Sequence, residues 1–132
     1  MTRENVQAVA DIFEGWRRGD FGVGEDVWHP QIEFVVDDTV SVSPGTFHGV
    51  AEMSDSWREQ LSAWEWFDAV VEEIVEAKDQ IVVFNRIRGR GRGSGIDVDA
   101  RRAAVFTFRD GKVVSLRLTT REEALELTGR GE

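Results

Sequence analysis

A chain of 132 residues with an apolar content of 41% can bury a core, and we expect residues 1–132 to form a single domain. Its formal net charge of −9 argues against binding to phosphate backbones, and the absence of cysteine excludes disulfide and thiolate chemistry. No apolar run reaches the length of a membrane span and the N-terminus is unlike a signal peptide, so a cytoplasmic protein is expected.

The first half of the chain has the pattern of helices around one strand. Apolar residues recur at helical spacing in segments expected to be helical, at residues 3–18, 25–28 and 50–64. Phe13 lies on the apolar face of the first of them. Alternating β-branched residues predict a strand over 31–38, whereas the Ser-, Pro- and Gly-rich stretch at 39–49 predicts a loop.

The second half is expected to form a β-meander that ends in a short helix. Alternating, β-branched segments predict four strands, at residues 67–77, 80–91, 97–108 and 112–120. Thr120 and Glu123 form a capping-box pattern for the last helix. Helices first and an antiparallel sheet afterwards indicate the α+β class.

The segment "RIRGRGRGSG" looks like an RNA-binding arginine–glycine string, but its spacing of two is the period of a strand. A two-residue turn at 94–95 places Arg92 opposite Asp97 and Arg90 opposite Asp99, which are favourable cross-strand pairs. We therefore interpret the arginines as a salt-bridged outer face, with the glycines between them at a bend of the hairpin. No nucleic-acid partner is expected.

The same register gives the hairpin an inward face that is mostly apolar. Asn85 then lies opposite Ala104, and Arg102 lies opposite Ile87. Polar groups in such company must be paired or hydrated, or they line a pocket. Glu73 is either a cavity carboxylate or the partner of an inward cation such as Arg102. The residues expected to line a cavity are Phe13, Trp28, Phe34, Trp64, Glu73, Asn85, Arg102, Ala104, Phe106, Leu116 and Thr120.

The last hairpin admits two registers. A two-residue turn at 110–111 places Phe106 opposite Ser115, whereas a three-residue loop with Gly111 left-handed aligns Phe106 with Val114. We choose the loop because it brings the apolar faces together.

Apolar residues also remain on the outward face of the predicted sheet. They are Val70, Ile74, Val82, Phe84 and Val105. A patch of this kind needs a cover, and the simplest cover is a second copy of the chain. A homodimer through the outer sheet face is therefore expected.

The whole chain resembles a known group of proteins. A first helix that ends in "GD", the segment "WHPQIEF", the "FHG" before the next helix and the terminal "AVFTFRDGKVVSLRL" carry the resemblance. They are similar to the SnoaL-like, ketosteroid-isomerase-like branch of the nuclear transport factor 2-like superfamily. The resemblance implies a cone-shaped fold in which a strongly bent antiparallel sheet wraps around N-terminal helices and encloses a cavity, usually as a homodimer. Its members include isomerases, cyclases, hydrolases and binding proteins, so the fold does not settle the function.

The resemblance implies only part of a catalytic apparatus. Steroid isomerases of this group use a tyrosine and a protonated aspartate as oxyanion donors, at positions that hold Ile12 and Ala104 here. Polyketide cyclases carry a carboxylate on the last strand, near 119–120, where this chain has none. The general base should lie at the end of the first strand, at Asp37 or Asp38.

Three polar residues are the candidates for acid–base chemistry. Asp37 or Asp38 at an apolar cavity mouth would have a raised pKa and could abstract a proton, although both also fit a solvated turn. His48 could reach the rim and exchange protons near neutral pH.

Trp16 and Trp57 are interpreted as core residues. No metal is expected from two scattered histidines, and no cofactor is expected.

The sequence thus predicts a cavity for a small hydrophobic molecule of the carbonyl type. The activity would be that of an acid–base isomerase, cyclase or hydrolase. The alternative is a non-catalytic ligand-binding or dimerisation module.

Overall fold

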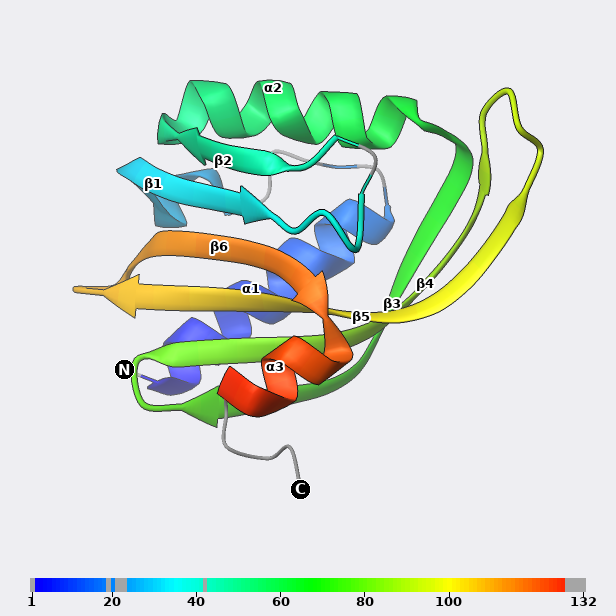
Figure 1. Cartoon of the computed structure of the whole chain (residues 1–132). Coiled ribbons are helices and arrows are strands. Elements are labelled where there is room, and N and C mark those ends of the chain that lie inside the picture. Colours follow the sequence, from blue (N-terminus) through cyan, green and yellow to red (C-terminus); the bar gives the residue numbers. More distant parts are fainter. Residues whose placement is uncertain (1, 19, 21–23, 42, 128–132) are drawn as a thin grey trace.

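The computed structural model describes residues 2–18, 20, 24–41 and 43–127. Within these ranges, the first half of the chain holds two α-helices and two strands, and the second half holds four strands and a last helix (Figure 1). The elements are α1 (Thr2–Arg17), the 3-10 helix η1 (Glu25–Val27), β1 (Trp28–Val36), β2 (Gly45–His48), α2 (Gly49–Ser62), β3 (Trp64–Ala77), β4 (Gln80–Gly91), β5 (Asp97–Arg109), β6 (Lys112–Thr120) and α3 (Arg121–Leu127). Among the described residues, no helix is long and apolar enough to cross a bilayer.

The six strands form one sheet in the order β2-β1-β6-β5-β4-β3. Figure 1 shows that β3, β4 and β5 bend strongly, with α1 on the inner face of the sheet and α3 on the other. The expected α+β cone, with a bent sheet wrapped around helices, is confirmed. The sheet is mixed rather than antiparallel throughout, because β1 runs parallel to β6. The expected loop over 39–49 is wrong at its end, where β2 forms and pairs with β1.

The main core lies between the inner face of the sheet and the helices α1 and α2. Val9 and Ile12 from α1 are fully buried against Phe34 of β1, Phe106 of β5 and Leu116 of β6. Successive side chains along a strand point to opposite faces of the sheet, with the period of two that the sequence predicts. One face of the sheet therefore supplies this core.

A smaller core covers part of the outward face. Val82, Phe84 and Val105 pack there against Ala124 of α3, and the guanidinium of Arg121 lies 5.0 Å from the centre of the Phe84 ring. The helix α3 begins with the expected cap, in which the Glu123 N–H donates to the Thr120 hydroxyl at 3.1 Å. The chain therefore covers by itself much of the patch for which we expected a second copy, and homodimer formation stays a prediction.

The β4–β5 register differs from the expected one by two residues. Asn85 pairs with Arg102 and not with Ala104. The turn is longer than two residues, and the hairpin tip contacts the end of α2, where the Arg92 N–H donates to the Ala63 carbonyl at 2.8 Å. Because a slip of two is even, every side chain keeps the face that the sequence predicted.

The β5–β6 hairpin reaches the predicted face alignment by another route. Its turn has two residues, Asp110 and Gly111, with left-handed φ angles of 52° and 79°. A bulge at Val114 then shifts the register, so that Phe106 pairs with Leu116. The expected three-residue loop and the pairing of Phe106 with Val114 are therefore wrong.

A second bulge, in β3, moves the predicted faces of that strand. The ladder shifts between Val71 and Glu73, after which Glu73 pairs with Phe84 and Ile74 pairs with Val83. Ile74 thereby turns inward and packs on the main core, whereas Glu73 is exposed. The expectation that Glu73 faces inward and Ile74 faces outward is wrong, because one extra residue reverses the alternation.

Candidate ligand-binding cavity

A cavity of about 660 Å³ lies on the inner face of the bent sheet, under the far ends of β3, β4 and β5. Residues of α1, the last turns of α2 and the segment 38–41 close its other sides. These three strands bend strongly (Figure 1), and the cavity lies on the inner side of the bend. Of the residues predicted to lie at the site, six line this cavity: Phe13, Asp38, Trp64, Asn85, Arg102 and Ala104.

Aromatic rings form much of the cavity wall. The rings of Phe13 and Trp16 in α1 lie 4.9 Å apart, and Trp16 lies 4.7 Å from Trp57 of α2. Trp64 and Phe67 of β3 form a second pair at 5.5 Å. Tilted rings in contact present a broad, rigid apolar surface.

Two of the polar side chains that line the cavity lie on neighbouring strands. Asn85 of β4 is 4% exposed, and its side-chain Oδ1 has no hydrogen-bond partner among the described residues. Arg102 of β5 lies directly opposite it in the ladder. The Arg102 guanidinium donates to the Arg101 carbonyl at 3.3 Å, and no ion pair to Arg102 exists within the described part of the chain. A buried acceptor without a partner costs about 1–3 kcal/mol, so this arrangement is a stability cost that a ligand could offset.

The two adjacent aspartates have different surroundings. Asp37 accepts hydrogen bonds from Arg117 Nε at 3.1 Å and Arg117 Nη2 at 3.2 Å, and a further one from the Thr119 hydroxyl. Asp38, the next residue, is exposed and lines the cavity. The strand end therefore holds one carboxylate in an ion pair and leaves the other at the cavity wall.

The segment that carries Asp38 is fixed to α2. The side-chain amide of Gln60 donates to the Ser43 carbonyl at 2.8 Å, and the Ser41 hydroxyl donates to the Gln60 side-chain oxygen. These bonds give the cavity wall a defined position relative to the aromatic residues of α2.

The remaining predicted residues lie elsewhere. Trp28, Phe34 and Leu116 line a separate hollow of about 280 Å³, and Phe106 is fully buried in the core. Thr120 caps α3 as described above. His48 is exposed at the start of α2, where its backbone N–H donates to Glu52 at 2.8 Å.

Sequence reasoning missed several residues of the cavity. Trp16 and Trp57 line it, although their helical spacing suggested core packing. Both do pack on the core, and the same side chains also border the space beside it. Gln60 and Ile96 line it as well. The signal for the tryptophans was present in the pattern, since both lie in the apolar stripe near the C-terminal end of a helix.

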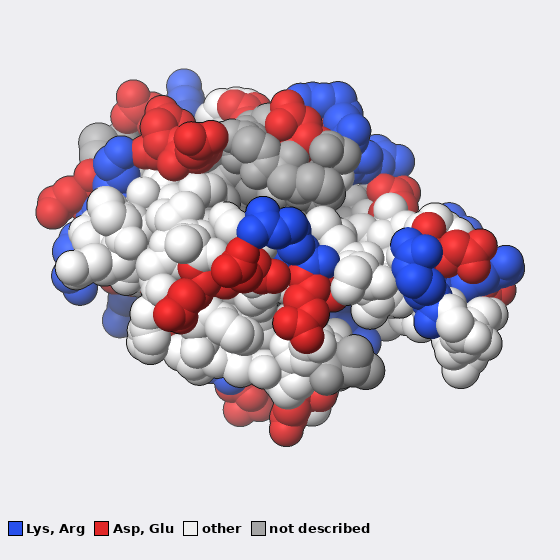
Figure 2. Space-filling model, turned by 90° about the horizontal axis from the view of Figure 1, so that it is seen from above, with Lys and Arg blue, Asp and Glu red and all other residues white. Residues whose placement is uncertain are grey.

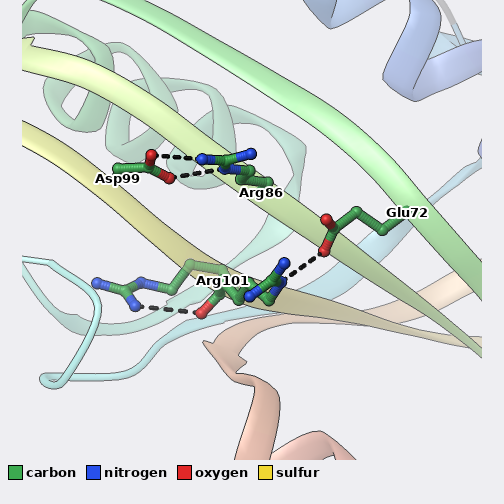
Figure 3. Close-up of polar contacts among 5 residues, drawn as sticks. Glu72, Arg86, Asp99 and Arg101 are labelled. Atoms are coloured by element: carbon green, nitrogen blue, oxygen red, sulfur yellow. Dashed lines mark hydrogen bonds and ion pairs between the residues drawn. The ribbon is translucent and has the colours of Figure 1, made fainter.

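Arginines of the segment 86–92 bind carboxylates on the outward face and backbone carbonyls at the hairpin tip. Arg86 binds Asp99 through two hydrogen bonds, at 2.7 and 2.6 Å, and Figure 3 shows this pair beside the ion pair of Arg101 and Glu72. Arg90 binds Asp97 at 2.8 Å. The expected pairing of Arg90 with Asp99 is wrong by the same two-residue slip.

The hydrogen bonds of these pairs shift the titration of both carboxylates. The bond from Arg86 lowers the pKa of Asp99, and the bond from Arg90 lowers the pKa of Asp97. Arg92, expected to face Asp97, instead donates to the Ser62 and Trp64 carbonyls at 3.2 and 2.9 Å.

The surface seen from above, over α2, mixes both signs of charge. Figure 2 shows acidic and basic side chains side by side on this face, including the projecting part of the molecule. Single-sign fields are what concentrate nucleic acid at a surface.

Among the described residues, no three His, Asp or Glu side chains converge in a cluster that could hold a metal ion.

The sequence is similar to that of a known protein family. A family model described as the SnoaL-like domain matches residues 9–116. A comparison with curated protein sequences gave no match.

Several solved structures share the fold. A putative SnoaL-like polyketide cyclase from Jannaschia sp. is 24% identical, with a TM-score of 0.77, and the match covers 98% of this chain and 94% of that one. A nuclear transport factor 2-like protein from Burkholderia thailandensis is 22% identical, with a TM-score of 0.79 over 96% and 95% of the two chains. TerC, co-crystallised with polyporic acid, is 21% identical, with a TM-score of 0.76 over 94% and 96%.

Proposed function

The chain belongs to the SnoaL-like domain family, and from this premise we propose that its cavity binds a small hydrophobic molecule with a carbonyl-type oxygen. The observation that carries the proposal is the cavity itself, because about 660 Å³ is within the ordinary range of ligand sites. Its aromatic wall suits an apolar body, and the Nδ2 amide group of Asn85, which lines the same space, can donate a hydrogen bond to a carbonyl-type oxygen. TerC, which shares this fold, has been co-crystallised with polyporic acid.

Titration with acetonaphthone, a neutral aromatic ketone, tests this binding function. We expect calorimetry to detect binding to the wild type and a loss of at least about tenfold in affinity, or about 1.4 kcal/mol, in Ile87→Trp. Ile87 lines the cavity, so an indole there fills the space. Arg88→Trp is the matched control, because Arg88 is exposed on the opposite face of the same strand. Equal affinity in the two variants would place the binding outside the cavity and contradict the proposal.

Acid–base catalysis is the second candidate function, and the position of Asp38 favours it. Its carboxylate lines the same cavity as the Asn85 side chain, so a bound carbonyl compound has a proton acceptor and an amide within one space. The Asn85 amide would then replace the oxyanion donors of steroid isomerases, whose positions hold Ile12 and Ala104 here. The reaction class is proton transfer beside a carbonyl, as used in isomerisation and cyclisation.

Exchange of the methyl protons of acetonaphthone for deuterium separates catalysis from binding alone. We expect the wild type to accelerate exchange in heavy water, as followed by NMR, and Asp38→Asn to lose most of the acceleration while it still binds the ketone. A positioned general base contributes roughly 10²–10⁴-fold, so the loss should fall within that range. Binding without any exchange in the wild type would indicate the non-catalytic alternative.

A further inference from the structure

Two neighbouring polar side chains in the cavity, Asn85 and Arg102, form a pair that we call the head-group site. They lie opposite each other on β4 and β5 and face an otherwise largely aromatic and aliphatic space. Directly opposed residues of an antiparallel pair have Cβ atoms about 5 Å apart. One ligand head group with two neighbouring oxygens can therefore contact both side chains.

Arg102 differs in its contacts from the three arginines that form ion pairs on the outward face of the same hairpin and its neighbouring strand. Arg86, Arg90 and Arg101 each bind a carboxylate on the outward face. Arg102 donates only to a backbone carbonyl in the described part of the chain, although acidic residues outnumber basic ones by 25 to 16 in the sequence. A guanidinium that lines a cavity without a counter-ion favours an anion there, and its planar fork suits a carboxylate or an acidic enol oxygen.

Asn85 adds a second requirement. Its Oδ1 is the side-chain atom that is buried and without a partner, and this oxygen can only accept a hydrogen bond. An anionic oxygen cannot satisfy it, whereas a hydroxyl beside the anionic oxygen can. The two side chains together are thus complementary to an acid that carries a neighbouring O–H.

Asp38, the acidic residue on the cavity wall, bears on the orientation of such a ligand. It follows β1, which is separated from β5 by β6, so it lies on the order of 10 Å from the head-group site along the sheet. Its carboxylate repels an anion placed near it. The acid group of a ligand would accordingly point toward Arg102, with its apolar body against the aromatic wall.

We propose that the head-group site selects acidic ligands, namely apolar molecules that bear a carboxylate or acidic enol with a hydroxyl next to it. The aromatic wall holds the body, Arg102 pairs with the anionic oxygen and Asn85 accepts from the hydroxyl. This proposal rests on the cavity-binding function proposed above and narrows its ligand class.

Three probes with the same ring system test the selection: ortho-hydroxynaphthoate, naphthoate and naphthamide, titrated calorimetrically at neutral pH. We expect the wild type to bind them in that order, with at least about tenfold between the hydroxy acid and the amide. Arg102→Gln should lower the affinity for both acids and leave that for the amide unchanged. Asn85→Leu should remove the advantage of the hydroxy acid over naphthoate and keep the preference of naphthoate over the amide.

Controls separate this selection from folding and from the cavity function itself. Arg101→Gln removes a cation from the same strand but from its outward face, so the order of affinities should not change. Thermal unfolding checks each variant, and Arg102→Lys, which keeps the charge, should retain the preference for acids if Arg102→Gln does not fold. If the wild type binds the amide as tightly as the acids, the inference is wrong and the cavity function stands. If none of the three probes nor acetonaphthone binds, the cavity function itself is wrong.

Discussion

The β4–β5 hairpin has polar side chains on both of its faces, and the two faces differ in how these groups are satisfied. On the outward face, Arg86 and Arg90 hold Asp99 and Asp97 at hydrogen-bond distance, in places that water also reaches. On the inward face, Asn85 is almost fully buried and its Oδ1 has no partner within the described ranges. Polar groups are thus paired where pairing matters least for stability and left open where it matters most.

This difference separates two roles of polar residues in one hairpin. Exposed ion pairs contribute little to stability, and their value here is that they favour one register and one face. A buried group left open lowers stability and is retained only where something else compensates for it. The inward face is therefore the one on which a ligand can act, and experiments on each face should give different kinds of result.

The substitution Gly89→Ala should have the largest effect, because it acts on the inward face where β4 bends. A Cβ at this position would lie 2.6 Å from the ring of Trp64 and 2.7 Å from the Trp66 carbonyl. Overpacking of this kind costs typically 1–3 kcal/mol, and we expect a loss of about that size in the free energy of unfolding, measured by urea denaturation. Ligand affinity should fall too, since Trp64 lines the cavity.

Gly91→Ala is the matched control on the same strand. Its Cβ would meet mainly the side chain of Ser94 in the exposed hairpin tip, which can move. We expect a smaller change in unfolding free energy than for Gly89→Ala. Equal losses in the two variants would contradict the view that the close approach of Trp64 to the backbone of β4 shapes the cavity.

The faces of this hairpin could be predicted from the sequence, whereas the partners on those faces could not. Alternation distinguishes odd shifts of register from the correct one, because an odd shift exchanges the faces. A shift of two leaves the pattern unchanged, so the sequence correctly placed Asn85 and Arg102 inward but paired each with the wrong neighbour. In the true register Arg92 contacts the end of α2, which is remote in sequence and which strand alternation does not reveal.

Bulges set a second limit to prediction. The extra residue in β3 turns Glu73 to the outward face. The extra residue in β6 aligns the apolar faces after a two-residue turn, where we expected a three-residue loop. Neither bulge is marked by glycine, so no local signal announces it. The choice between Asp37 and Asp38 was open for a similar reason. Both follow the last residue of β1, where strand alternation no longer applies, and the contacts with Arg117 and Thr119 decide it.

The smallest expected effect concerns the outward face and its dependence on pH. The hydrogen bond from Arg86 lowers the pKa of Asp99 below its ordinary value of 3.8, so the folded state favours the carboxylate. A carboxyl with a lowered pKa adds stability that is present above its unfolded-state pKa and is lost as the pH falls through the folded-state value. The pair should therefore weaken only in strong acid. Its contribution at neutral pH should be small, because water surrounds both side chains.

An NMR titration of the side-chain carboxyls measures this directly. In Arg86→Gln we expect the pKa of Asp99 to rise toward its ordinary value while that of Asp97 stays lowered, and in Arg90→Gln the reverse. Each variant is thus the control for the other. If both Asp99 and Asp97 titrate at their ordinary values in the wild type, the outward pairs are not formed in solution. The contrast between a paired outward face and an open inward face would then be lost, because neither face would hold its polar groups in fixed contacts.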